Sequence, residues 1–269
     1  MSMIPIIKKL KGGPVVNVIR LSGVIAESGR FGGGALNDAT LGPLLERAFH
    51  KGKPKAVAIE LNSPGGSPVQ SSLIGARIRR LSTEKNVPVY AFCEDVAASG
   101  GYWLACAADE IYVDDSSIIG SIGVISASFG FHDLMKKQGV ERRVHTAGQD
   151  KSMLDPFRPE RPSDVKRLKA LQKKIHDNFI AHVQDRRGSK LASDKLFTGE
   201  VWIGKDAVDN GLVDGIAHLG AKMKERFGDD VRLNALGQKK SLFKRLGFGS
   251  SVNMISNIEE RIFWSQFGL

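Results

Sequence analysis

A serine flanked by small residues is the feature of this sequence best suited to nucleophilic chemistry. Ser99 lies in the run Ala97–Gly101 (AASGG), at the expected junction between a buried strand and a helix. Small neighbours leave the hydroxyl accessible, and a helix N-terminus supplies free N–H groups and positive potential beside it. The pattern fits a serine that attacks a carbonyl. Taken alone, it fits a simple helix N-cap even better.

A second glycine-containing turn, Asn62–Gly66 (NSPGG), closes the preceding buried strand. Its adjacent glycines leave backbone N–H groups free to point at an anion, and Pro64 stiffens the turn. We expect the N–H groups of Gly66 and Gly100 to stabilise an oxyanion formed at Ser99. A plain strand-to-helix turn is the alternative for this segment.

A nucleophilic serine needs a base, and the sequence offers histidines and one lysine of interest. His132 and His145 follow the serine in the chain, but neither lies in a turn typical of a triad, whereas His176 and His182 are expected on the surface of a long helix. Lys151 lies between an expected strand and a proline-rich loop. Desolvation favours the neutral, basic form of a lysine. With 39 basic residues in the chain, however, a surface role is the better expectation for Lys151 taken alone.

Other kinds of site find no support in the sequence. Cys93 and Cys106 are too few for a disulfide framework or a zinc site, and both are expected as buried, reduced thiols. No pair of histidines or carboxylates has ligand spacing, so no metal is expected. The glycines of residues 27–34 lack the dinucleotide fingerprint, and Gly204-Lys205 is followed by Asp206 instead of Ser or Thr. We therefore expect no cofactor.

Length and charge fit an ordinary globular protein. The chain has 269 residues and a net charge of +10, which is spread along it and favours solvated helix faces over nucleic-acid binding. The N-terminus has four apolar residues before Lys8, Lys9 and Lys11, which is neither a signal peptide nor a transmembrane anchor. These features predict a soluble cytoplasmic protein, at most attached peripherally to the inner face of the membrane.

The elements that must position these residues alternate along the chain. Strands are expected over residues 14–25, 55–62, 88–93, 110–113, 118–129 and 141–146. Helices are expected over residues 37–51, 97–108 and 131–138, after Gly66 with Leu73, Ile74, Ile78 and Leu81 on one face, and from Ser163 to Gly188. The alternation predicts an α/β fold with a largely parallel sheet, whose carboxyl edge is where ligands bind.

Five segments together resemble the signal peptide peptidase A family. They are Asn62–Gly66 (NSPGG), Ala97–Tyr102 (AASGGY), Ala107–Asp109 (AAD), Gly120–Ile125 (GSIGVI) and Gly148–Pro156 (GQDKSMLDP). The members of this family are Ser–Lys peptidases with a Clp-protease/crotonase-like fold of repeated β-β-α units. The resemblance covers about residues 14–217.

The resemblance assigns roles position by position. It implies that Ser99 is the nucleophile, Lys151 the general base and Ser121 the residue that orients the lysine amine. The N–H of Gly66 is similar to the family's oxyanion donor, and that of Gly100 is the expected second donor. A neutral Lys151 acting as base implies an alkaline activity profile.

This sequence departs from the family pattern at few positions. Trp103 occupies a position where a second aromatic residue, often Tyr, is common. Asp150 precedes the lysine and must face away from it, because an inward carboxylate would oppose base function. The N-terminal membrane anchor of many members is missing from this sequence.

The resemblance also implies substrates and partners. The family cleaves extended, hydrophobic peptides such as signal peptide remnants, which we expect to pair beside the turn formed by Ser63, Pro64, Gly65 and Ser67. Short members resemble homo-oligomeric rings in which serine and lysine come from neighbouring protomers. We expect a peptidase domain over residues 1–220 and a basic, amphipathic C-terminal helical extension over residues 221–269. This extension either packs between subunits or contacts a membrane surface.

Two other functions stay open at this point. A crotonase-like acyl-CoA enzyme would share the fold and the oxyanion turns but has no use for a Ser–Lys pair. A non-catalytic scaffold or assembly protein of the same fold would use neither residue.

Overall fold

The computed structural model describes residues 12–27, 35–148, 151–237 and 263–268. The chain divides into two compact units. Residues 1–122 and 180–269 form the first, here called the sheet unit, and residues 123–179 form the second, here called the insert unit. Each is described by itself.

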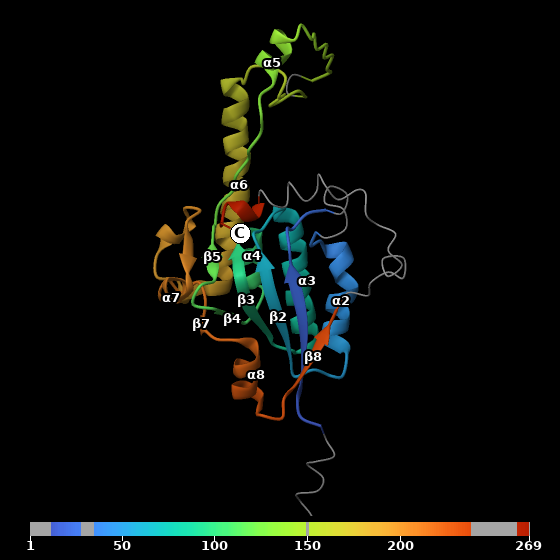
Figure 1. Cartoon of the computed structure of the whole chain (residues 1–269), viewed down its shortest axis with the longest axis vertical. Helices are drawn as coiled ribbons and strands as arrows, with labels where there is room; N and C mark the ends of the chain where they lie inside the picture. Colours follow the sequence, from blue (N-terminus) through green and yellow to red (C-terminus); the bar gives the residue numbers. More distant parts are fainter. Residues whose placement is uncertain (1–11, 28–34, 149–150, 238–262, 269) are drawn as a thin grey trace, which may run out of the picture. The chain divides into compact units, whose positions relative to one another are not determined.

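The sheet unit is built on one mainly parallel sheet, as the alternating pattern predicts (Figure 1). Its path runs β6-β5-β3-β2-β1-β8, with β4 paired to β3 and β7 paired to β4, and of these pairs only β5–β6 is antiparallel. The strands are β1 (Val15–Ser22), β2 (Ala56–Ser63), β3 (Val89–Ala98), β4 (Glu110–Val113), β5 (Ile118–Gly120), β6 (Val201–Ile203), β7 (Gly215–Ile216) and β8 (Arg232–Leu236). The central β2 is buried along nearly its whole length, as expected for a parallel strand covered on both faces.

The sheet branches at β3. Residues 90–93 of β3 pair with β4, whereas residues 96–98 pair with β5. The carboxyl end of β3 therefore lies between β2 and β5, beside the carboxyl ends of both. Parallel strands converge there at the edge where α/β proteins bind ligands.

Helices cover both faces of the sheet. On one face lie α2 (Asp38–His50), α3 (Pro68–Lys85) and α4 (Gly100–Ala105), which contact β1, β2 and β3 (Figure 1). On the other face α8 (Leu219–Phe227) inserts Met223 among Val16, Ala58 and Phe92. The unit is completed by α7 (Gly204–Asp209), the 3-10 turns η1 (Gly188–Lys190) and η2 (Asp194–Phe197), and the end of α6 (Pro162–Arg187).

Several sequence-based predictions of these elements are confirmed. The helix predicted over residues 37–51 is present as α2, and Asn37 caps it by accepting a hydrogen bond of 2.9 Å from the N–H of Thr40. Ile74, Ile78 and Leu81 form the buried face of α3. Cys93 and Cys106 are free and buried; burial raises the pKa of Cys106 to about 12.

Other predictions are wrong. The predicted strand over residues 118–129 ends at Gly120, and residues 141–146 form no strand. The predicted helix over residues 97–108 begins only at Gly100, because Ala97 and Ala98 extend β3 to pair with β5. Leu73 is 46% exposed and lies off the buried face of α3.

The C-terminal part of the chain contributes to the sheet. On the C-terminal side of residue 220 lie most of α8 and all of β8, and β8 pairs in parallel with β1. Most of the predicted extension, residues 238–262, lies outside the described residues, so the division at residue 220 stays a prediction. Among the helices of the described part of the chain, none is both long and apolar enough to cross a membrane.

Candidate active site

Ser99 occupies a strained position between β3 and α4. Its backbone angles are φ 52° and ψ −123°, which few non-glycine residues adopt. Two hydrogen bonds hold it there: its N–H donates to Gly120 O (2.8 Å), and its C=O accepts from the N–H of Trp103 (3.0 Å). The half-buried side chain makes no capping hydrogen bond. The strain and the uncommitted hydroxyl therefore favour a chemical role over the N-cap alternative.

The turn after β2 packs directly against Ser99. A Cβ added to Gly65 would lie 2.8 Å from both Ser99 Cβ and Gly100 N, and one added to Gly101 would lie 2.4 Å from Ser63 O. Side chains at these positions would force the two turns apart. The pairing of the two glycine runs at one edge, which the sequence predicted, is therefore a packing requirement of the fold.

The backbone around Gly66 is oriented by Ile25. The N–H of Ile25 donates to Gly65 O (2.8 Å), and Ile25 O accepts from the N–H of Ser67 (2.7 Å). Ile25 is thus hydrogen-bonded to the residues on either side of Gly66. In such parallel pairing, the N–H of Gly66 itself points away from Ile25. No described residue accepts a hydrogen bond from the N–H of Gly66 or of Gly100. A Cβ added to Gly100 would lie 3.3 Å from Gly66 N, so the two N–H groups flank the same small space.

The remaining residues of this turn hold it together. The buried Ser63 hydroxyl donates to Gly23 O (2.7 Å) and accepts from the N–H of Gly65 (3.2 Å). Ser67 caps α3 by accepting from the N–H of Gln70 (3.4 Å). The hydroxyl of Ser63 is thus committed to shaping the turn.

Ser121 lies beside Ser99 at the carboxyl edge of the sheet. Ala98 and Gly120 are paired in the register of β3 and β5, and the two serines directly follow them. Ser121 also has a positive φ of 50°, and its N–H donates to Glu200 O (2.7 Å). The sheet unit therefore brings together Ser99, Ser121 and the two glycine donors.

Lys151 belongs to the insert unit, so its association with Ser99 rests on sequence alone. Its N–H donates to Gly148 O across a turn (3.4 Å), and the residue is exposed. Lysine works as a base in its neutral form, which desolvation favours.

Sequence reasoning missed that His182 packs against α4, the helix that follows Ser99. Its ring stacks on Trp103 (centroids 4.5 Å apart, planes 9° apart), and its Nε2 lies 3.1 Å from Trp103 O. Burial lowers the pKa of His182 and favours its neutral form, in which an N–H at Nε2 donates to that carbonyl. The expectation of a surface histidine is wrong because α6 packs this face onto α4. The charged residues around His182 in the sequence gave no indication that its ring packs against Trp103.

Buried polar contacts fix the surroundings of α4. Arg186 Nε donates to Cys106 O (2.8 Å) beyond the last turn of α4, and Tyr102 Oη donates to Leu212 O (2.7 Å). Arg187 pairs with Asp214 at 2.8 Å. Burial alone would raise the pKa of Asp214, but hydrogen bonds, first of all from Arg187, hold it below its usual range. These contacts fix α4 at Tyr102 and just beyond its last turn, at Cys106.

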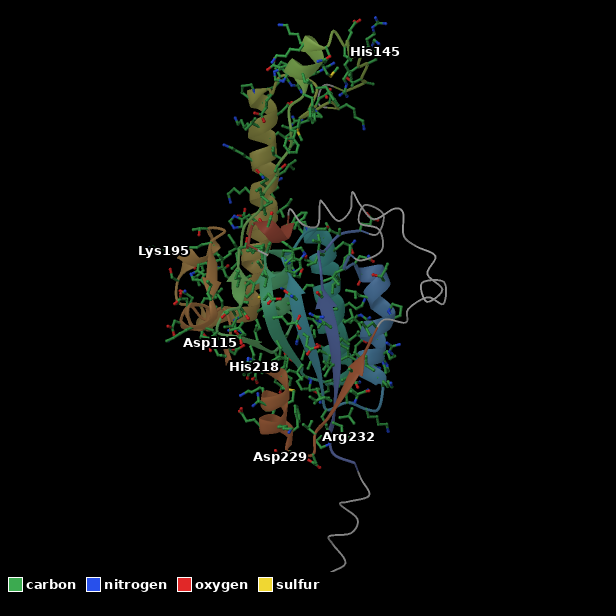
Figure 2. The ribbon with its side chains drawn as sticks, viewed as in Figure 1. Asp115, His145, Lys195, His218, Asp229 and Arg232 are labelled. Carbon is green, nitrogen blue, oxygen red and sulfur yellow. The ribbon has the colours of Figure 1, made fainter. Side chains whose placement is uncertain are left out.

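The two histidines considered as bases belong, like Lys151, to the insert unit. His132 and His145 both lie in the insert unit, where His145 is exposed (Figure 2) and His132 lies 3.4 Å from Asp133. His218, a residue of the sheet unit labelled in Figure 2, has its Nε2 2.9 Å from Asp114 Oδ2 at the surface. No group of three histidines, cysteines or carboxylates in the described residues is placed to hold a metal ion.

Comparison with known proteins gives a consistent family. Residues 82–226 match the model of peptidase family S49. The chain is 45% identical, over 94% of its length, to a Na(+)/H(+) antiporter NhaA of Brucella abortus, and this covers 37% of that protein. It is 29% identical, over 77% of its length, to a putative signal peptide peptidase SppA of Enterococcus faecium, and this covers 62% of that protein. The chain thus spans less than two thirds of either relative.

A solved structure shares the fold. The chain resembles the 1510-N membrane-bound stomatin-specific protease, in a variant bound to a substrate peptide. The TM-score is 0.53 at 15% identity, over 91% of this chain and 99% of that one. The mixed α/β fold is therefore that of the Clp-protease-like S49 peptidases.

Proposed function

Because the chain belongs to peptidase family S49, we propose that it is a serine endopeptidase in which Ser99 is the nucleophile and Lys151 the general base. One observation carries the proposal: Ser99 is held at a positive φ with an uncommitted hydroxyl, beside the free N–H groups of Gly66 and Gly100. A scaffold protein gains nothing from this strain. An acyl-CoA enzyme of similar fold would not need the serine.

The reaction proceeds in two steps. Lys151 accepts the Ser99 hydroxyl proton while Ser99 Oγ bonds to the scissile carbonyl carbon, whose oxygen becomes negative between the two glycine N–H groups. The C–N bond then breaks, Lys151 donates its proton to the leaving amine, and an acyl-enzyme remains on Ser99. Water, deprotonated by Lys151, hydrolyses this ester, and the proton returns to Ser99. Ser121 orients the lysine amine.

The substrate is an extended peptide with small or apolar side chains, such as a signal peptide remnant. Peptide binding in a solved relative of the same fold supports this substrate class. The peptide backbone lies beside the turn of Ser63, Pro64, Gly65 and Ser67, and its scissile carbonyl reaches Gly66. Ser63 contributes by shaping this turn, since its hydroxyl is already bonded on both sides.

The working form is a homo-oligomer in which one protomer supplies Ser99 and its neighbour supplies Lys151. The placement of these residues in separate units and the exposure of Lys151 support this arrangement. The C-terminal segment either packs between subunits or rests on a membrane surface. Flotation with anionic liposomes, with and without residues 240–269, separates these two roles.

Hydrolysis of a chromogenic peptide ester tests the catalytic assignment. Ser99→Ala should abolish turnover, and Lys151→Ala should lower kcat/KM by about 10²–10⁴-fold. Lys137→Ala is the matched control, because Lys137 is another exposed lysine of the insert unit, on α5 (His132–Lys137). Wild-type turnover by Lys151→Ala would remove Lys151 from the mechanism, and turnover by Ser99→Ala would remove the nucleophile.

A further inference from the structure

Ser71 is a fully buried serine that the proposed mechanism does not use. It lies in the first turn of α3, the helix that follows the Gly66 turn. Its hydroxyl donates to Ser67 O (2.9 Å), and the same carbonyl oxygen also accepts the backbone N–H of Ser71 (3.0 Å). The hydroxyl is therefore held in one direction by a carbonyl group whose helical hydrogen bond is already made.

The hydroxyl of Ser71 does not favour the helix that carries it. Serine has a lower helix propensity than alanine, and a side-chain hydrogen bond to the carbonyl four residues earlier slightly destabilises a helix. Burial also removes the hydroxyl from water. Alanine would therefore suit α3 better at this position, so the reason for a serine lies outside the helix.

The Ser71 hydroxyl fills the space beside Gly100, the first residue of α4. A Cβ added to Gly100 would lie 2.4 Å from Ser71 Oγ, the nearest atom outside α4 and the chain neighbours of Gly100. The next atoms, Gly66 N and Ile25 Cδ1, are both 3.3 Å away. The φ of Gly100 is not positive, so its backbone conformation suits any residue. The neighbouring hydroxyl is what requires glycine here.

Gly100 is thus held from two sides by the turn that contains Gly66. On one side, a Cβ added to Gly65 would lie 2.8 Å from Gly100 N. On the other side, the Ser71 hydroxyl lies against Gly100 and is fixed by Ser67 O. Gly65 and Ser67 directly precede and follow Gly66. The two contacts therefore set the separation between the N–H groups of Gly66 and Gly100.

We propose that Ser71 is a positioning residue, whose hydroxyl fixes the spacing of the two N–H groups that receive the oxyanion and thereby requires glycine at position 100. The effect on catalysis rests on the proposed function, whereas the effect on spacing does not. Donors placed for the negative oxygen of the transition state act mainly on kcat, because the ground-state carbonyl makes weaker use of them. Loss of the hydroxyl should therefore lower kcat and leave KM unchanged.

Two other roles for Ser71 lead to different expectations. A residue that only stabilises the fold would lower the melting temperature when truncated, and activity would fall with the amount of folded protein. A direct donor to the oxyanion would need a free proton, but the hydroxyl proton of Ser71 is bonded to Ser67 O. Ser71 therefore acts through the two glycines and not on the substrate.

Ser71→Ala tests the role of the hydroxyl in peptide-ester hydrolysis. We expect kcat to fall about 10-fold, less than on removal of a donor, with KM changed by less than about twofold. The melting temperature should stay equal to or slightly above that of the wild type, because alanine favours the helix. A peptide aldehyde, whose adduct with Ser99 places an anionic oxygen between the donors, should bind about 10-fold more weakly. Ser72→Ala, at the exposed next position of α3, is the matched control and should equal the wild type.

Gly100→Ala tests the spacing from the other side. In the wild-type background its Cβ meets the Ser71 hydroxyl at 2.4 Å, and kcat should fall about 100-fold. In the Ser71→Ala background the other nearest atoms are 3.3 Å away, so the same substitution should lower kcat only about 10-fold. The urea midpoint of unfolding should show the same coupling, with a larger decrease for Gly100→Ala in the wild-type background than in Ser71→Ala.

Three results would overturn the proposal. They are a kcat of Ser71→Ala equal to that of Ser72→Ala, a melting temperature of Ser71→Ala that falls along with its activity, and equal effects of Gly100→Ala in the two backgrounds. The proposed function fails by a different result, in which the wild type hydrolyses no ester and Ser99 takes up no fluorophosphonate. The urea midpoints then still decide whether Ser71 sets the spacing of the two turns.

Discussion

The two units of the molecule hold the two halves of the proposed site in opposite ways. Around Ser99 in the sheet unit, the neighbouring turns interlock so closely that a single Cβ at Gly65 would collide with the serine. Lys151 lies exposed in an insert unit in which Phe179, at its end, is the one buried apolar residue among those described. The fold of the sheet unit therefore positions the proposed nucleophile and the proposed oxyanion donors in advance. The environment of the proposed base, Lys151, depends on what packs against the insert unit.

The same contrast holds for charged groups. The sheet unit buries an ion pair, Arg187–Asp214, with Arg187 only 3% exposed. In the insert unit, pairs such as Lys173–Asp177 are open to solvent. Substitutions should therefore have large effects in one unit and small effects in the other, unless assembly is disturbed.

Among the substitutions that compare the two units, Gly66→Ala has the largest expected effect. The new Cβ would lie 2.0 Å from Ile25 O at a φ of +139°, so the donor N–H must move. We expect kcat of peptide-ester hydrolysis to fall by about 10²–10³-fold. Gly139→Ala in the insert unit, at φ +64° with no atom within 4 Å, should keep wild-type activity. Equal losses of kcat in Gly66→Ala and Gly139→Ala would show that the two units do not differ in their tolerance of an added side chain.

Next in size is the activity recovered by mixing two inactive variants. If Ser99 and Lys151 act between protomers, Ser99→Ala and Lys151→Ala together form mixed oligomers in which some sites are complete. Exchange of subunits should restore about a quarter of wild-type turnover. Ser99→Ala mixed with the double variant Ser99→Ala/Lys151→Ala, which supplies no Ser99, should restore none. Absence of recovery after proven subunit exchange would place both residues in one protomer.

A smaller effect, on stability, is expected for Asp214→Asn. Removing this charge leaves Arg187 buried without its partner, which typically costs about 3–5 kcal/mol of unfolding free energy. Asp177→Asn removes the exposed pair with Lys173 in the insert unit. We expect it to lower the free energy of unfolding by less than about 1 kcal/mol. Urea unfolding followed by tryptophan fluorescence measures both. Comparable losses of unfolding free energy in Asp214→Asn and Asp177→Asn would show that burial of an ion pair does not make it more important for stability in the sheet unit than in the insert unit.

The lowered pKa of Asp214 also fixes a direction of pH dependence. A carboxyl group with a depressed pKa in the folded state contributes stability above its unfolded pKa, and this contribution is lost as pH falls through the folded pKa. Asp214→Asn should therefore differ most from the wild type at neutral pH and least in strong acid.

The smallest effect concerns His182. Burial lowers its pKa in the folded protein, so the unfolded chain binds more protons as pH falls below about 6.5, and folding weakens. His182→Phe keeps an aromatic ring on Trp103 but does not titrate. Its melting temperature should drop less between pH 8 and pH 5 than that of the wild type. The control is His145→Phe in the insert unit, whose melting temperature should fall between pH 8 and pH 5 as much as that of the wild type. A fall in the melting temperature of His182→Phe as large as that of the wild type would refute the assignment.

The sequence predicted the sheet unit well because its local signals agree with its packing. Continuous apolar runs marked β2 and β3, and NSPGG and AASGG marked the turns that converge on Ser99. The same signals failed where the outcome depends on a distant partner. Residues 118–129 have strand composition, but beyond Gly120 they pair with no strand in the part of the chain that the structure describes. His182 was missed because only tertiary packing places its ring on Trp103.

Intact-mass spectrometry after exposure to a fluorophosphonate tests the central claim most directly. The wild type should gain one adduct, mapped to Ser99, Ser99→Ala should gain none, and Lys151→Ala should gain it at least about tenfold more slowly. Labelling of Ser99→Ala at the wild-type rate, or an adduct on another residue, would contradict the account.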